Sequence, residues 1–157
     1  MKKLGLIIIT IVSFYACKKE TTQTPTQVAS LLNEIDGKQF RKSSILISAD
    51  SIVDTIPTID AFTVLPDCKK DNIWSFNKTA KVFTIDEGPH TCVPTDPQIK
   101  DQGTLLEINS NDLKVAGTST NEIWNIESVT SSSFRVSYFA KNASNKTVKF
   151  RVTFTKI

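Results

Sequence analysis

The sequence is poor in the residues that carry catalytic or metal chemistry. It holds a single histidine, His90, among 157 residues, and it lacks a Gly-x-Ser-x-Gly elbow, a His-Glu-x-x-His pair and a P-loop. Cys68, Cys92 and His90 together would leave a tetrahedral zinc site one ligand short. We therefore expect a protein that is not an enzyme and that has no metal and no cofactor.

The chain also lacks a block of charge of one sign. Its formal net charge is +3 at pH 7, and two of these charges, Lys2 and Lys3, lie in a segment that we expect to be removed, which leaves +1. Proteins whose main partner is nucleic acid carry clustered Lys and Arg side chains. We therefore expect no nucleic-acid partner.

No apolar run reaches the length of a membrane-spanning helix, which needs about 20 apolar residues. The run over residues 4–16 follows two lysines and ends in the small residue Ala16. A positive start, a short apolar run and a small residue are typical of a cleaved export signal. The sequence therefore predicts that residues 1–16 are a signal peptide.

The end of this run, Phe14-Tyr15-Ala16-Cys17, resembles a lipobox, the cleavage and lipidation site of bacterial lipoproteins. The resemblance implies acyl chains such as palmitate on Cys17, and a membrane of the cell envelope, expected to be the outer membrane, as the partner. Several acyl chains hold a protein stably, whereas one gives marginal binding. Residues 17–27 contain no large apolar side chain and would form a flexible tether. The alternative is a secretory signal that is followed by an unmodified cysteine.

Two cysteines, Cys68 and Cys92, remain once Cys17 carries lipid. Thiols of an exported domain tend to pair, because the compartment is oxidising. The chain-entropy model gives a bond between them a stabilisation of about 3.5 kcal/mol. The alternative is two free thiols.

The domain over residues 28–157 begins with a helical spacing and continues with a period of two. Val28, Leu31 and Ile35 share one stripe of a short helix, and Gly37 suits a left-handed helix end. Alternating apolar and polar residues then indicate strands with one buried face. Strands are expected over residues 38–48, 73–76, 81–85, 103–108, 113–116, 121–129, 134–138 and 148–154.

Short polar turns join most of these strands in sequence, which favours an all-β fold. Eight strands in an antiparallel up-and-down order can close into a small barrel, and closure removes exposed sheet edges. Residues 49–71, with a helical turn expected near residues 60–65, and the proline-rich residues 87–102 fit no simple strand. We expect these two segments to form a cover over the barrel.

Four parts of the sequence are similar to the lipocalin-like domain of small bacterial envelope lipoproteins. They are Pro66-Asp67-Cys68-Lys69-Lys70-Asp71-Asn72, Phe76, Phe83-Thr84-Ile85-Asp86-Glu87-Gly88 and Cys92. Gln39 and Leu105 stand where members often have Trp. The resemblance implies an eight-stranded lipocalin-like barrel with an opening helix, and a Cys68–Cys92 disulfide. It implies little about function, because a fold hosts many activities.

The large aromatic side chains of the expected strands are the candidates for a ligand pocket. In an open barrel they would line a cavity for a small hydrophobic molecule, whereas in a small closed barrel they would fill the core. The leading hypothesis is a membrane-anchored binding module. The alternative is a non-catalytic interaction protein with a packed barrel, whose loops contact a protein or a glycan. The candidate ligand-binding residues are Trp74, Phe76, Phe83, Trp124, Phe134 and Tyr138.

Overall fold

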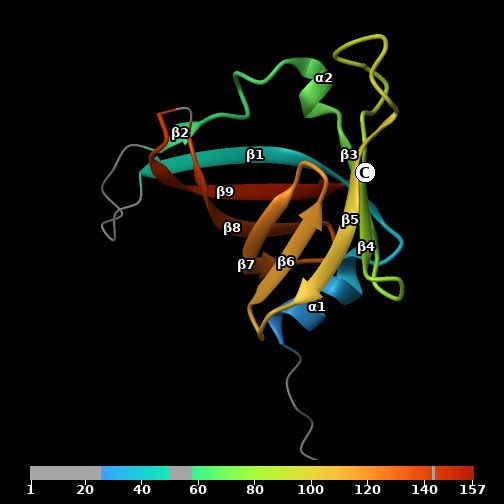
Figure 1. Cartoon of the computed structure of the whole chain (residues 1–157). Helices are drawn as coiled ribbons and strands as arrows, with labels where there is room; N and C mark the ends of the chain where they lie inside the picture. Colours follow the sequence, from blue (N-terminus) through green and yellow to red (C-terminus); the bar gives the residue numbers. More distant parts are fainter. Residues whose placement is uncertain (1–25, 50–57, 143) are drawn as a thin grey trace, which may run out of the picture.

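The computed structural model of the chain describes residues 26–49, 58–142 and 144–157. Its strands form a closed antiparallel up-and-down barrel, which confirms the predicted fold class (Figure 1). The predicted signal peptide and Cys17 lie outside the described residues. No helix in the described ranges is long and apolar enough to cross a membrane. The elements are α1 (Gln27–Ile35), β1 (Gln39–Ala49), β2 (Ile59–Asp60), α2 (Asp67–Lys70), β3 (Ile73–Asn77), β4 (Val82–Asp86), β5 (Ile99–Glu107), β6 (Asp112–Gly117), β7 (Asn121–Val129), β8 (Ser133–Lys141) and β9 (Thr147–Lys156).

The helix α1 closes one end of the barrel. Thr26 caps it, because its hydroxyl accepts a hydrogen bond from the amide of Ala29 at 3.0 Å. The apolar stripe of α1 is fully buried, and Gly37 ends the helix with a φ of +66°, the left-handed conformation that the sequence predicted. The helix begins at Gln27, one residue before the predicted domain boundary, and it packs mainly against β7.

The half of the barrel next to α1 is packed with aromatic rings. Phe134 and Phe154 stack with ring centroids 4.6 Å apart, and Phe40 meets Phe134 edge to face at 5.1 Å. Trp124 lies 5.3 Å from Phe154 and is 1% exposed. Offset and edge-to-face ring pairs stabilise a core beyond the area that they bury. This half of the barrel therefore has the filled interior expected of a small eight-stranded barrel.

The other half of the barrel opens, because two of its seams are short. The pairing of β1 with β3 covers only residues 39–41 of β1, and that of β7 with β8 begins at Asn125 and Ser137. Beyond these points β1 continues along β9 to Ala49, and β8 continues along β9 to Lys141. The strands β8, β9 and β1 therefore diverge from the strands β3 to β7 at the end opposite α1 (Figure 1).

Two connections, residues 61–72 and 87–98, lie at this open end, and we call them the lid (Figure 1). A disulfide joins Cys68 to Cys92 with Cα atoms 5.1 Å apart, which confirms the predicted pairing. Residues 59–60 pair with β1, and a single turn follows within the expected range, in which the amide of Leu65 donates to the carbonyl of Phe62 at 3.2 Å. The short helix α2 begins only after Pro66, because the residue before a proline is disfavoured in the helical conformation.

Candidate functional site

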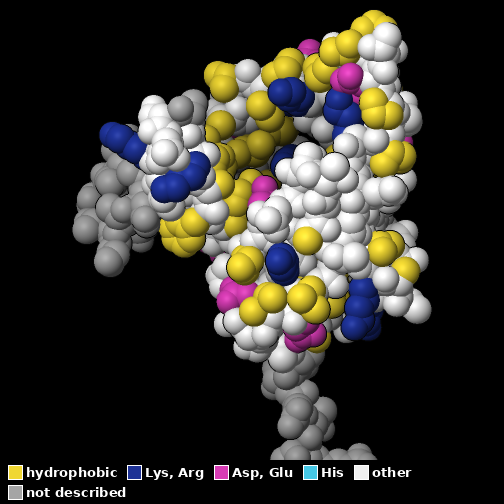
Figure 2. All heavy atoms as spheres, viewed as in Figure 1, with side chains coloured by type: hydrophobic (Ala, Val, Ile, Leu, Met, Phe, Trp, Pro, Cys, Tyr) yellow, Lys and Arg dark blue, Asp and Glu magenta, His cyan; other side chains and the backbone are white. Residues whose placement is uncertain are grey.

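A cavity of about 670 Å³ lies at the open end of the barrel, between its two diverging halves and under the lid, and we call it the mouth cavity. Figure 2 shows the hollow, with hydrophobic side chains on its floor. Ligand pockets in proteins span about 300 to 1,000 Å³, so the volume suits a small molecule. The apolar lining consists of Ile45, Leu65, Trp74, Ile85, Cys92 and Val93.

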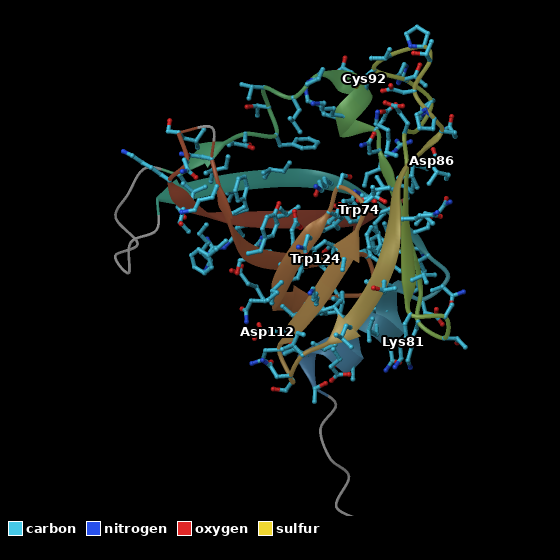
Figure 3. The ribbon with its side chains drawn as sticks, viewed as in Figure 1. Trp74, Lys81, Asp86, Cys92, Asp112 and Trp124 are labelled. Carbon is cyan, nitrogen blue, oxygen red and sulfur yellow. A yellow bond between two sulfur atoms is a disulfide. The ribbon has the colours of Figure 1, made fainter. Side chains whose placement is uncertain are left out.

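The structure separates the six predicted ligand-binding aromatic residues into three groups. Trp74 lines the mouth cavity, and Figure 3 shows its side chain on the inner side of the barrel. Tyr138 lines a separate hollow of about 580 Å³ on the wall between β7 and β8. The other four, Phe76, Phe83, Trp124 and Phe134, are buried in the packed core. Among the described residues, Trp74 is thus the one member of the set that lines the mouth cavity.

Lys42 places a positive charge on the inner face of the barrel. It pairs with Phe154 across β1 and β9, and side chains of directly paired residues share a face of the sheet. Its Nζ atom lies 4.8 Å from the centre of the Trp74 ring and 5.9 Å from that of Phe154. A bulge between Lys42 and Ser44 then returns Ile45 to the inner face, so that both residues line the cavity.

Glu122 is the carboxylate whose charge acts on Lys42. It alternates in phase with Trp124 along β7, and its Oε2 atom accepts a hydrogen bond of 2.6 Å from the Trp124 Nε1 atom. Burial lowers the pKa of Lys42, and the charge of Glu122 opposes this shift without cancelling it. Burial, with a smaller contribution from Glu122, raises the pKa of the Tyr138 hydroxyl. Lys42 and Glu122 therefore give an otherwise aromatic floor two opposite charges.

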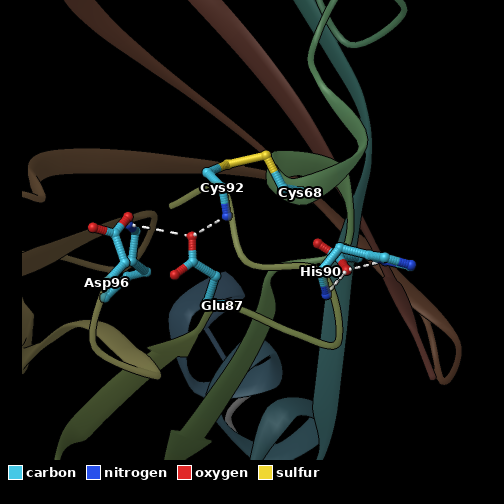
Figure 4. The surroundings of a disulfide bond; sticks show 7 residues. Cys68, Glu87, His90, Cys92 and Asp96 are labelled. Atoms are coloured by element: carbon cyan, nitrogen blue, oxygen red, sulfur yellow. Dashed lines mark hydrogen bonds and ion pairs between the residues drawn. A yellow bond between two sulfur atoms is a disulfide. The ribbon is translucent and has the colours of Figure 1, made fainter. Parts of the chain in front are cut away.

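A buried carboxylate, Glu87, ties the lid to the barrel beside the disulfide (Figure 4). Glu87 has no exposed surface, and its Oε1 atom accepts a hydrogen bond from the amide of Cys92 at 3.1 Å. The Nζ atom of Lys100 lies 3.3 Å from the same carboxylate and also pairs with Asp96. Hydrogen bonding to Asp96 raises the pKa of Lys100. This network positions the loop after β4 over the cavity.

His90, the single histidine of the chain, lies in the lid and contacts Asp71. Its Nδ1 atom lies 2.8 Å from the Oδ2 atom of Asp71, and its amide donates to the same oxygen. Asp71 thereby links the α2 connection to the loop after β4. Within the described ranges, no group of three or more His, Cys, Asp or Glu side chains is arranged to hold a metal ion.

Asp101 holds the β6–β7 turn at the rim of the cavity. It is 4% exposed, and its carboxylate accepts hydrogen bonds from the amides of Thr118, Ser119 and Thr120 and from the Ser119 hydroxyl. Burial opposes ionisation, but the hydrogen bonds from Thr120, Ser119 and Thr118 outweigh it and lower the pKa of Asp101 to about 2.

Asp101→Asn should destabilise the protein at neutral pH and have no such effect in strong acid. Because the folded-state pKa is lowered to about 2, the stabilisation is complete above the unfolded value of 3.8 and is lost as the pH falls through 2. The free energy of unfolding should drop by about 2 kcal/mol at pH 7. Urea unfolding at several pH values measures this difference.

A matched control for this prediction is Asp67→Asn. The Asp67 side chain is 92% exposed, so its substitution should change the free energy of unfolding by less than about 0.5 kcal/mol. A difference between wild type and Asp101→Asn that stays constant down to pH 2 would contradict the assignment to the Asp101 charge.

The sequence analysis missed the polar residues of the cavity, although part of the signal is readable. Glu122 stands two residues before Trp124 in a strand whose bounds were predicted as 121–129, which places it on the buried face. Lys42 was hidden, because the bulge after it breaks the alternation between Phe40 and Ile45. Asp101 was assigned to a loop, because β5 begins at Ile99 instead of residue 103.

No model of a protein family matches this chain, and no curated protein matches it. The geometry itself defines a class: an antiparallel up-and-down β-barrel, closed by a helix at one end and carrying a lidded cavity at the other. This architecture is consistent with a lipocalin-like all-β fold.

Proposed function

We propose that this protein is a lipid-anchored lipoprotein of the cell envelope whose lipocalin-like barrel binds a small hydrophobic ligand in the mouth cavity. The observation that carries the proposal is the cavity of about 670 Å³ with an apolar and aromatic lining. Pockets for small molecules are mostly apolar and contain a few polar groups that fix orientation. The mouth cavity has this composition.

The arrangement of the barrel favours ligand binding over the alternative of a fully packed interaction module. The aromatic core fills only the half next to α1, whereas the lid half keeps a hollow interior. Proteins are packed as densely as organic crystals, so a large apolar hollow without a role is uncommon. A disulfide that holds the lid in place over the hollow is consistent with a preformed pocket.

The lipid anchor is proposed from the sequence, on the resemblance of residues 14–17 to a lipobox. Phe14-Tyr15-Ala16-Cys17 would place acyl chains on Cys17, and the tether would let the barrel stand away from the membrane. Mass spectrometry of the N-terminal peptide of the mature protein tests this part. An unmodified Cys17 thiol, or residues 1–16 still attached, would refute it.

Filling the cavity should abolish ligand binding. The pair Ile45→Trp and Ile85→Trp adds two indole rings to the lining of the cavity. Native mass spectrometry of the mature protein after extraction in mild detergent should show a co-purifying lipid on the wild type, and the bound fraction should fall at least tenfold in this double variant. The physical reason is steric, since the two indole rings would occupy the apolar surface on which the body of the ligand lies.

The matched control is the pair Ile59→Trp and Ile99→Trp. These isoleucines are 65% and 44% exposed and are not part of the cavity lining, so the control variant should bind as the wild type does. Near-UV circular dichroism checks that both variants are folded. A wild-type protein that carries no lipid in repeated preparations, and takes up none of the hydrophobic probes described below, would overturn the binding function.

A further inference from the structure

Lys42 places a cation on the floor of the cavity. Among the described residues, the Lys42 ammonium lies over the rings of Trp74 and Phe154 and forms no ion pair. The Lys42 side chain is half-buried, and its ammonium group offers three hydrogen-bond donors. The cation–π contacts recover only part of the lost hydration. Lys42 therefore presents unused donors to the interior of the cavity.

The carboxylates of the cavity have partners of their own, although the Oε2 atom of Glu87 accepts no hydrogen bond from the described residues. Asp101 is saturated by the β6–β7 turn, and Glu87 and Asp96 both pair with Lys100. Glu122 accepts a hydrogen bond from Trp124, and its attraction does not offset the effect of burial, which lowers the pKa of Lys42. Among the described residues, none of the carboxylates of the lining forms an ion pair with the Lys42 ammonium. A second negative group placed next to Lys42 would be stabilised.

The lining around Lys42 indicates the chemistry of the rest of the ligand, which should be apolar. The Trp74 ring faces the ammonium, while Ile45, Ile85, Leu65 and Val93 continue the apolar lining up to the lid. A molecule in the cavity would meet two charged groups on the floor, Lys42 and Glu122, and an apolar surface between them and the lid. Lys69 is an exposed cation at the rim, where water can hydrate it.

We propose that the ligand is an amphipathic acid, whose carboxylate accepts hydrogen bonds from the Lys42 ammonium while its apolar body lies against Trp74, Ile45 and the lid. This inference rests on the proposed ligand-binding function and specifies the chemistry of its site. A charge-assisted hydrogen bond to the Lys42 ammonium should favour the acid over the corresponding alcohol by about tenfold to a hundredfold in affinity.

Equilibrium dialysis of the mature protein in lipid nanodiscs tests the proposal with two radiolabelled probes of equal chain length, decanoate and 1-decanol. Empty nanodiscs give the partition background, and the pair Ile45→Trp and Ile85→Trp gives the background of a filled cavity. The wild type should bind decanoate at least tenfold more tightly than decanol. Lys42→Met keeps the length of the side chain and should remove this preference while changing decanol affinity by less than twofold.

Two further variants separate a contact with the ligand from a packing role. Lys42→Arg keeps the charge and should retain a preference for decanoate, whereas Lys69→Met at the rim should change either affinity by less than threefold. Equal binding of acid and alcohol by the wild type, or an equal loss of both probes in Lys42→Met, would overturn the acid assignment and leave the binding function standing. Absence of binding of either probe above the filled-cavity background would overturn both.

Discussion

Phe154→Ala should lower the free energy of unfolding by about 4 kcal/mol, since truncation of a fully buried phenylalanine removes apolar burial and leaves a hole. Phe154 is 0% exposed and contacts Phe134, Trp124 and Trp74 with ring centroids 4.6, 5.3 and 5.3 Å away. It joins the packed core to the cavity floor, so its neighbours belong to both halves of the barrel. Urea unfolding followed by far-UV circular dichroism measures the change.

The chain offers a matched control one strand away. Phe139 on β8 is 60% exposed, so Phe139→Ala removes the same atoms from a site where little burial is lost. We expect a change of less than about 0.5 kcal/mol. A loss below about 1 kcal/mol for Phe154→Ala would show that the surrounding rings close the hole, and that the aromatic core is less rigid than its ring contacts indicate.

The fold could be predicted from the sequence because most of its strands have one face in a dry core and one in water. In β7, Trp124 and Ile126 alternate with exposed residues, and the predicted bounds 121–129 match the structure. The last two strands, β8 and β9, also alternate and pair as a hairpin. In a closed barrel this period of two recurs along every strand, so that local patterns are enough to give the global fold.

The predicted beginning of β5, residue 103, was wrong, because a polar residue before it, Asp101, points into the barrel. Asp101 is in phase with Leu105 on the buried face, but a buried Asp is rare unless its oxygens are satisfied. Its partners, the amides of residues 118–120, lie on a turn that is distant in sequence. A pattern of apolar residues carries no information on such partners. Residues 99–102 therefore resembled a loop.

The cavity itself could not be predicted, because it arises from where pairing stops. The seams β1–β3 and β7–β8 end early, and no residue type marks those ends. The candidate ligand-binding residues were chosen because their side chains are large and aromatic. Large aromatic side chains mostly fill the packed half of the barrel instead of lining the cavity. Lys42 and Glu122 line the cavity, whereas most of the aromatic residues do not. In the sequence, both look like ordinary strand residues. Charge on a predicted buried face is the signal that would have found Glu122.

Removal of the Cys68–Cys92 bond should have the second of the two largest effects on stability. The bond closes a loop with a sequence separation of 24, for which the chain-entropy model gives about 3.5 kcal/mol. The pair Cys68→Ser and Cys92→Ser should lower the free energy of unfolding by about this amount in urea. Wild type measured in the presence of a reductant is the matched control and should show the same loss.

The bond should also have a local effect on the lid. The amide of Cys92 donates to the buried carboxylate of Glu87, and the disulfide keeps this amide next to that carboxylate. Without the bond, water can reach Glu87, and a carboxylate gains hydration when it is exposed. Hydrogen exchange of the Cys92 region should therefore accelerate in the serine pair more than exchange in β7. If both regions kept wild-type exchange rates and the free energy of unfolding were unchanged, the contacts of Glu87 and Lys100 would be sufficient to hold the lid, and the disulfide would be dispensable for the pocket.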